Sequence, residues 1–207
     1  MKINTVIKHF RLICKHKKYV FQFCIKAGIP FRGLIHDLSK FSPTEFFESV
    51  KYYTGTKSPI DTSKEVNGYS KAWQHHKGRN THHYEYWMDN FDKGGEAIPM
   101  PYKDAVEMLC DYLGAAKAYL GNDFSYEKEY EWWIKKSENC AAHKYTKQFI
   151  EYCLFYLKEE KNAPEKLVFN KHFLNYYYKR AYHIKSDKLE LAIVFPGVYN
   201  STPRIFE

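Results

Sequence analysis

The stretch RGLIHDLSKFSPTEFF, residues 32–47, combines polar and apolar residues in a way that any proposed fold has to explain. It places His36 and Asp37 side by side behind Gly-Leu-Ile, a setting typical of a buried helix, with Lys40 four residues after the histidine. A buried imidazole or carboxylate is costly unless it is hydrogen-bonded or binds a metal ion. The stretch therefore predicts either a buried polar pair or the centre of a metal site.

The spacing of apolar residues on both sides of this stretch predicts an all-α protein. Residues 4–27, for example, carry Ile13, Val20 and Cys24 at helical intervals, together with Val6 and Phe10. Turn-forming residues predict loops at 54–68 and 92–99. Helices are expected at residues 31–40, 43–53, 70–77, 81–90, 101–120, 125–138 and 143–161 as well.

The helix after the opening stretch has a clear start signal. Ser42 is suited to be the N-cap, Pro43 to the first turn, and Glu45 follows three residues after the serine. We expect about seven or eight helices in one domain, residues 1–163. The pattern assigns no regular structure to the C-terminal extension, residues 164–207, apart from a possible strand at 189–195.

Composition limits the class of protein. A chain of 207 residues can bury a sizeable core. Lys2, Lys8 and Arg11 interrupt the first apolar positions, which argues against a signal peptide, and no apolar run is long enough to span a bilayer. The net charge of +8 comes from scattered lysines, as on solvated helix faces. Five cysteines without a C-x-x-C pair predict reduced, buried thiols of a cytoplasmic protein: Cys14, Cys24, Cys110, Cys140 and Cys153.

Histidines are concentrated in AWQHHKGRNTHHYEYW, residues 72–87. His75 and His82 are seven residues apart, as are His76 and His83, so on one continuous helix each pair would share a face. Gly78 bends the chain between them, and both pairs can still reach one cavity. We expect one histidine of each pair to point inward; the alternative is a set of surface histidines packed in part against tryptophan.

Two further polar groups lie at apolar helix faces. His16 borders the buried face of the first helix, where a hydrogen-bonded core histidine is the alternative to a ligand. Asp111 is surrounded in helical projection by Val106, Leu109 and Leu113, where a carboxylate is costly unless paired or metal-bound. Imidazole and carboxylate together suit Zn, Mn, Fe or Co, with Mg possible. Inward groups from separate helices would hold one or two such divalent ions within a bundle.

The order His … His-Asp … Asp on successive helices resembles the HD-domain superfamily of metal-dependent phosphohydrolases. LIHDLSKF is similar to the His-Asp-x-Gly-Lys signature of its cyclic-dinucleotide phosphodiesterase branch, although Ser39 replaces the glycine and the Gly-Tyr-Pro segment of that branch is absent. HHKGRN is similar to the later His-His segment of the same branch. Over residues 5–160, GLIHDLSKFSPTEF, YYTGTKSPI, GYSKAWQHHKGRNTHHYEYW and MPYKDAVEMLCDYLGAAKAYLG resemble a family of uncharacterised bacterial and phage proteins.

The resemblance implies an HD-domain-like helical bundle and a set of site residues. It implies one metal ion held by His16, His36, Asp37 and Asp111, and a second held with His76 and one of His82 or His83. It implies that a water activated by the metal attacks a nucleotide or another small phosphoester. Asp37, Lys40 and Arg79 are the candidate catalytic residues, and the last two would contact phosphate.

Two other functions remain open. The same framework hosts di-iron oxygenases, and a non-catalytic metal-binding or regulatory module is also compatible with the pattern. A nucleic-acid partner is not favoured, because the sequence lacks helix-turn-helix, zinc-finger and RNA-binding signatures. The oligomeric state is left open.

Overall fold

The computed structural model describes residues 2–90, 92, 94–183 and 203–206. Within these residues the regular structure is helical, and the one β-type pairing is an isolated antiparallel bridge between Met88 and Ala97. The prediction of an all-α protein is therefore confirmed. The possible strand at 189–195 lies outside the described residues.

The described chain contains ten α-helices, more than the seven or eight expected. Three short 3-10 helices join them: η1 (Leu38–Phe41), η2 (Tyr84–Trp87) and η4 (Gly121–Asp123). The α-helices are α1 (Ile3–Lys26), α2 (Pro30–Ile35), α3 (Pro43–Lys51), α4 (Pro59–Asn67), α5 (Lys71–Lys77), α6 (Tyr102–Leu120), α7 (Tyr126–Glu138), α8 (Lys144–Glu159), α9 (Pro164–Val168) and α10 (Lys171–Ala181).

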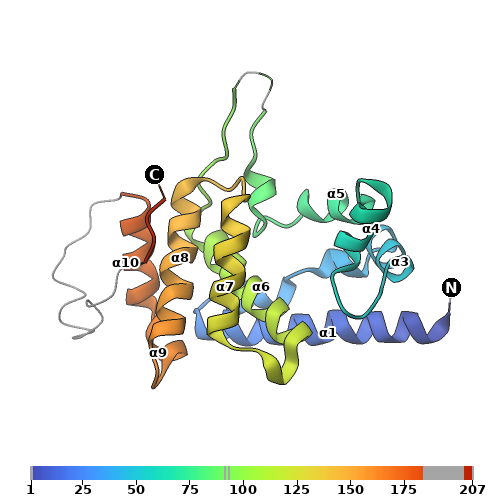
Figure 1. Ribbon diagram of the computed structural model, residues 1–207, viewed down its shortest axis with the longest axis horizontal. Helices are drawn as coiled ribbons and strands as arrows, with labels where there is room; N and C mark the ends of the chain where they lie inside the picture. The colour runs from blue at the N-terminus through green and yellow to red at the C-terminus, as the bar shows by residue number, and fades with distance from the viewer. Residues whose placement is uncertain (1, 91, 93, 184–202, 207) are drawn as a thin grey trace.

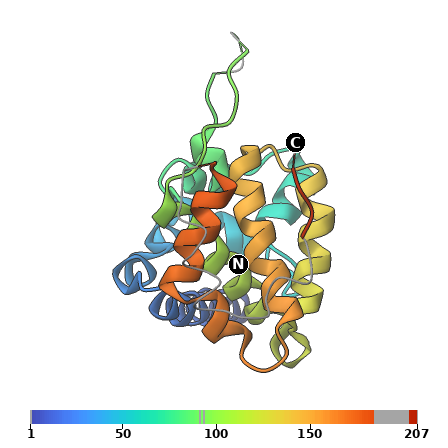
Figure 2. The same cartoon turned by 90° about the vertical axis from the view of Figure 1, so that its left-hand side faces the viewer.

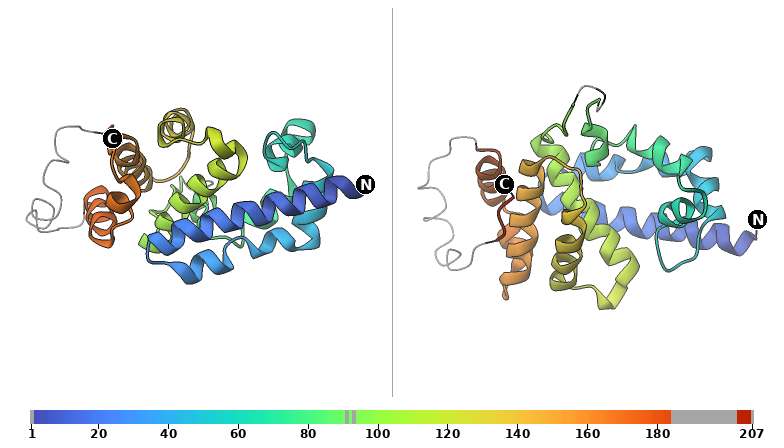
Figure 3. Two further views of the ribbon diagram at one scale, coloured as in Figure 1. Left: turned by 90° about the horizontal axis from the view of Figure 1, so that it is seen from below. Right: turned by 45° about the horizontal axis from the view of Figure 1, so that its top comes forward.

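Helix α1 is the longest helix of the described chain and packs against α2, α3 and α6 (Figure 1). After α1 the chain reverses, and α2 lies alongside it (Figure 3, left). Helices α3, α4 and α5 form a group near the N-terminal half of α1, while α7, α8 and α10 stand side by side at its other end (Figures 1 and 2). Helix α6 packs against α1 between these two groups, and the hydrophobic core fills the space around α6, α8 and α10.

Two glycines allow the helices to pack closely on α1. A Cβ atom at Gly114 of α6 would lie only 2.4 Å from Val20 Cγ2 and 2.9 Å from the Val20 backbone nitrogen. A Cβ atom at Gly33 of α2 would lie 2.6 Å from Cys24 Cβ. A larger residue would clash at either position, so glycine sets the separation of α2 and α6 from α1.

The expected helix at 31–40 is wrong in one respect that matters for the site. Helix α2 ends at Ile35, His36 is extended with ψ 130°, and Asp37 adopts the left-handed conformation with φ 55°. Aspartate is one of the few residues other than glycine that tolerate this conformation. His36 and Lys40 therefore do not share a helix face, because the chain turns sharply between them.

Other boundaries were predicted with mixed success. Ser42 accepts a hydrogen bond from the Glu45 backbone N–H, which confirms the predicted cap. The expected loop at 54–68 contains α4, which begins at Pro59. The expected helix at 81–90 is wrong, because only the short η2 forms there. Beyond residue 163, α9 and α10 add buried side chains to the core.

Two predictions from composition can be compared with the structure. All five cysteines are free, but only four are buried, because Cys14 is exposed. Among the described helices, none combines the length and the apolar character that a bilayer crossing requires.

Candidate metal centre

Four side chains from three parts of the fold converge on one point. His16 comes from α1, His36 and Asp37 from the turn between α2 and η1, and Asp111 from α6. His16 Nε2 lies 3.1 Å from Asp37 Oδ2 and 3.2 Å from Asp111 Oδ1. His36 Nε2 lies 3.2 and 3.3 Å from the same two oxygens and 3.3 Å from His16 Nε2. We call these four residues the first donor set.

The spacing of these atoms fits a metal ion. Ligand bonds of about 2.0–2.1 Å place neighbouring ligand atoms about 3.3–3.4 Å apart in a tetrahedral site and about 2.8–3.0 Å apart in an octahedral one. The observed 3.1–3.3 Å lies between these values, so it suits a metal ion without selecting one. All four residues are buried, and the first donor set could therefore hold a metal ion.

A second donor set shares Asp37 with the first. Asp37 Oδ1 lies 3.2 Å from His76 Nε2 and 3.4 Å from His82 Nε2, and His76 Nε2 lies 2.8 Å from His83 Nε2. Asp37 Oδ1 and His82 Nε2 are buried without a hydrogen-bond partner among the described residues. Unpaired buried polar atoms are rare, and such atoms pointing toward one another are typical of a metal site. This set could also hold an ion.

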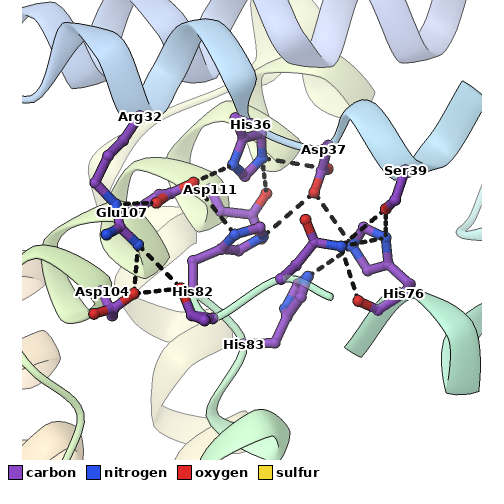
Figure 4. A network of polar contacts seen from close by, with 12 residues as sticks. Arg32, His36, Asp37, Ser39, His76, His82, His83, Asp104, Glu107 and Asp111 are labelled. Atoms are coloured by element: carbon purple, nitrogen blue, oxygen red, sulfur yellow. Dashed lines mark hydrogen bonds and ion pairs between the residues drawn. The ribbon is translucent and has the colours of Figure 1, made fainter. Parts of the chain in front are cut away.

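Two glutamates lie behind three of these histidines, and Figure 4 shows one of them, Glu107, beside His36 and His82. Glu107 Oε1 lies 2.9 Å from His36 Nδ1 and 3.3 Å from His82 Nδ1, and Glu45 Oε2 lies 2.7 Å from His76 Nδ1. A histidine whose Nδ1–H donates to a carboxylate presents the lone pair of Nε2, and its ring is held in place. The two glutamates thus orient His36, His76 and His82 toward the donor sets.

Arg32 supports this outer layer from α2. Its Nε donates to Glu107 Oε2 at 2.5 Å, and its Nη2 donates to Asp104 and to Thr81 Oγ1 (Figure 4). Thr81 lies just before His82, so Arg32 links the turn that carries His82 to α6. The same guanidinium therefore fixes two segments that both contribute to the centre.

The charges of the centre favour a cation between its carboxylates. Burial opposes ionisation of Asp37, but His36, Lys40 and His76 outweigh it and hold the Asp37 pKa well below its ordinary value. Burial likewise opposes charge on His36, but Asp37, Asp111 and Glu107 raise its pKa well above the ordinary value. Positive charge is thus stabilised here, whether carried by protons on the histidines or by a metal ion.

A pocket opens beside the first donor set. It encloses about 880 Å³ of empty space, part of it open to solvent, and His16, His83 and Asp111 form part of its wall. Lys40 is the one lysine or arginine among the described residues that line it. Its ammonium lies 2.5 Å from Asp37 Oδ2. A ligand in this pocket would therefore meet the donor atoms and one fixed positive charge.

The structure brings together nearly all of the predicted site residues. The seven candidate ligands all lie in the two donor sets: His16, His36, Asp37, His76, His82, His83 and Asp111. Both His82 and His83 belong to the second set, where only one of the two was expected. Lys40 is beside them. Arg79 is exposed, donates to the His75 backbone carbonyl at 3.3 Å and lines a second groove, whose wall also includes His36 and His82. His75 turns away from the donor atoms and contacts Glu45 at 2.6 Å.

Sequence reasoning missed the carboxylates that hold the histidines. The sequence pattern assigns Glu45 only to a helix cap, although the side chain is buried at 3% exposure, and it gives Glu107 no role. One signal was present for Glu107, which precedes Asp111 by four residues and so lies on the same face of α6. No comparable local signal existed for Glu45, whose partners are thirty residues or more away in the sequence.

Comparison with known proteins places the chain in a family. The model of a family of unknown function, DUF5662, matches residues 5–155, which include both donor sets, Glu45, Glu107 and Lys40. No curated protein and no solved structure matches the chain significantly. Because the family match spans well over half of the 207 residues, the chain belongs to the DUF5662 family.

Proposed function

We propose that this protein binds one or two divalent metal ions in the two donor sets and hydrolyses a small phosphoester, most simply a nucleotide. The observation that carries the proposal is the convergence of seven buried or half-buried side chains on two adjacent donor sets that share Asp37. A carboxylate shared between two ion sites is a common arrangement for phosphoester hydrolysis. The resemblance of the His … His-Asp … Asp order to the HD-domain superfamily supports the same function.

The residues of the chain have separate tasks in this proposal. Asp37 offers one oxygen to each donor set, and Glu107 and Glu45 keep the histidine rings aligned. Lys40, on the pocket wall, is close enough to the first donor set to donate to a phosphate oxygen that also lies there. A bound divalent ion would supply a Lewis acid and a water of lowered pKa.

The pocket determines what the substrate can be. Its wall next to Lys40 and the donor sets is polar, whereas the rest is mainly apolar, with Trp73 and Tyr119 among its residues. A phosphate group suits the first part and an apolar or aromatic group the second. Arg79, the other predicted phosphate contact, does not line this pocket; it lines a second groove, whose wall includes His36 and His82.

Metal content and hydrolysis are tested on the full chain. Elemental analysis of the purified protein is combined with a screen of nucleotides and simple phosphoesters after loading with Mn, Mg, Zn, Fe or Co. Asp37→Asn removes the shared charge while keeping a side chain that tolerates the left-handed conformation. Asp123→Asn, at an exposed position, is the matched control.

We expect bound metal and hydrolysis in the wild type and in the control, and neither in Asp37→Asn. The proposal is refuted if no divalent metal binds, if Asp37→Asn keeps the full metal content, or if no phosphoester is cleaved with any of the five metals. Iron content with oxygen consumption and no hydrolysis would indicate an oxygenase. Bound metal without any turnover would indicate a non-catalytic module.

A further inference from the structure

His9 is a buried histidine in the pocket wall that belongs to neither donor set. It lies on α1 seven residues before His16, and with Leu12 and Ile13 it belongs to the same face of that helix. Only 5% of its surface is exposed, and its ring packs against Phe46 and Tyr53, with 5.5 Å between ring centroids in both cases. Unlike His16, it has no carboxylate beside it.

Both ring nitrogens of His9 are buried without a hydrogen-bond partner among the described residues. The only other buried side-chain atoms in this condition there are Asp37 Oδ1 and His82 Nε2, which belong to the second donor set. A buried donor or acceptor that is left unpaired lowers the stability of the folded protein. All the unpaired atoms thus belong to residues of the centre or of its pocket, where a bound ligand would supply the missing partners.

The position of His9 defines how long that ligand is. Seven residues of α-helix correspond to about 10.5 Å along the axis of α1. This separation between His16 and His9 is comparable with the distance from the phosphate to the outer polar edge of the base in an extended nucleoside monophosphate. Between the two histidines the wall is apolar, with Leu12, Ile13 and Ala115. A sugar phosphate would place hydroxyl groups against this apolar section, whereas a flat base has apolar faces and a polar edge.

The charge of His9 further restricts the ligand. Burial, and then the nearby ammonium of Lys40, lower the pKa of His9 to about 4. The imidazole is therefore neutral near pH 7 and offers one N–H donor and one nitrogen acceptor. A neutral ring is suited to a neutral polar group, such as the edge of a base, rather than to a second phosphate.

We propose that His9 recognises the base of a nucleoside phosphate whose phosphate group lies at the first donor set. This inference rests on the proposed hydrolase function and adds the class of substrate and the residue that selects it. The base would lie along the apolar section of the pocket, with its polar edge hydrogen-bonded to His9. His9 is a specificity-determining residue and takes no part in bond cleavage.

Direct binding is measured first, without any need for turnover. Adenosine, guanosine, cytidine, uridine and inorganic phosphate are each titrated into the full chain by calorimetry, and the histidine ring signals are followed by NMR. We expect at least one nucleoside to bind and to shift the His9 signals, which are identified by their loss in His9→Phe. That variant should bind the nucleoside about tenfold more weakly, the loss expected for one hydrogen-bonding partner.

Selectivity is then measured with the metal-loaded protein. His9→Phe should lower kcat/KM for the nucleotide about tenfold more than kcat/KM for p-nitrophenyl phosphate, which has no base. His9→Gln, which keeps a donor and an acceptor, should restore most of the difference. His172→Phe, at an exposed position on α10, is the matched control and should change neither value.

The outcomes separate this inference from the proposed function. If no nucleoside binds the wild type, or if His9→Phe binds it equally well, His9 does not recognise a base, even when p-nitrophenyl phosphate is cleaved. If a nucleoside binds through His9 but no phosphoester is cleaved, the nucleoside site stands and the hydrolase is refuted. If His9→Phe fails to fold, His9→Leu and the wild-type NMR titration decide the same question.

Discussion

Replacing Gly114 by alanine should weaken both the fold and the metal centre. The new Cβ atom would lie 2.9 Å from the Val20 backbone nitrogen, about 0.5 Å closer than the 3.4 Å of ordinary contact. Backbone atoms cannot rotate away as a side chain can, so α1 and α6 must separate. Asp111 lies one turn before Gly114 on α6, and His16 lies one turn before Val20 on α1. Moving the two helices apart therefore lengthens the 3.2 Å contact between Asp111 and His16.

The size of the effect follows from two opposing contributions. Overpacking a tight helix contact costs about 1–3 kcal/mol, and a backbone clash belongs at the upper end of that range. Alanine in place of glycine inside a helix increases the stability of that helix by about 1 kcal/mol. The net loss should be about 2 kcal/mol, which lowers the melting temperature by about 4–8 °C in a chain of this size. A donor set displaced by about half an ångström should bind metal roughly tenfold more weakly.

Urea unfolding and calorimetric metal titration on the same preparation measure both effects. Gly33→Ala should behave similarly, because its Cβ atom would lie 2.6 Å from Cys24 Cβ. Gly78→Ala is the control, since the nearest atom to its Cβ is 3.5 Å away. If Gly114→Ala is as stable as the wild type and binds metal equally well, close packing on α1 does not set the geometry of the centre.

Three further predictions concern single side chains. Asp37→Asn should lose the metal of both donor sets, whereas Asp111→Asn should lose only that of the first; equal metal stoichiometry in the two variants would contradict a shared carboxylate. Burial, with a smaller contribution from Asp111, raises the pKa of Glu129 from 4.5 to about 8. At Glu129 the native state therefore binds more protons than the unfolded chain between these pH values, so the contribution of this side chain to stability falls as the pH rises from 4.5 to 8. Glu129→Gln should remove this loss, about 1.4 kcal/mol for each pH unit, in denaturation curves from pH 4.5 to 8; parallel curves for the two proteins would refute it. His9→Phe should raise the free energy of unfolding by about 1–2 kcal/mol, because it removes unpaired buried nitrogens, while His172→Phe should change it by less than about 0.5 kcal/mol.

The long helices could be predicted from the sequence because their signals are local. Apolar spacing placed the first helix at residues 4–27, and the structure has it at Ile3–Lys26. The Ser42 cap was equally visible. Helix α4 was missed because its residues, PIDTSKEVN, resemble a loop and form a helix with few apolar positions. Even within α1 the periodicity put Phe10 in the buried stripe, whereas His9 is buried and Phe10 is about half exposed.

The ligand residues could be predicted because buried polar groups are conspicuous among apolar neighbours. Their partners could not, because contacts such as those of Glu45 with His76 and of Arg32 with Glu107 join segments far apart in the sequence. The choice between His75 and His76 depended on the position of α5 relative to α3. No local pattern contains that information, since it follows from how the helices pack.

The conformation of residues 36 and 37 shows why the centre lies at a helix end. On a continuous helix, consecutive side chains point about 100° apart, so His36 and Asp37 could not both face the same point. The extended backbone of His36 and the left-handed backbone of Asp37 turn both side chains inward. The same turn directs one oxygen of Asp37 to each donor set. His36 and Asp37 follow an apolar helix because that helix has to end before them. Only then can both side chains face the centre and Asp37 be shared between the two donor sets.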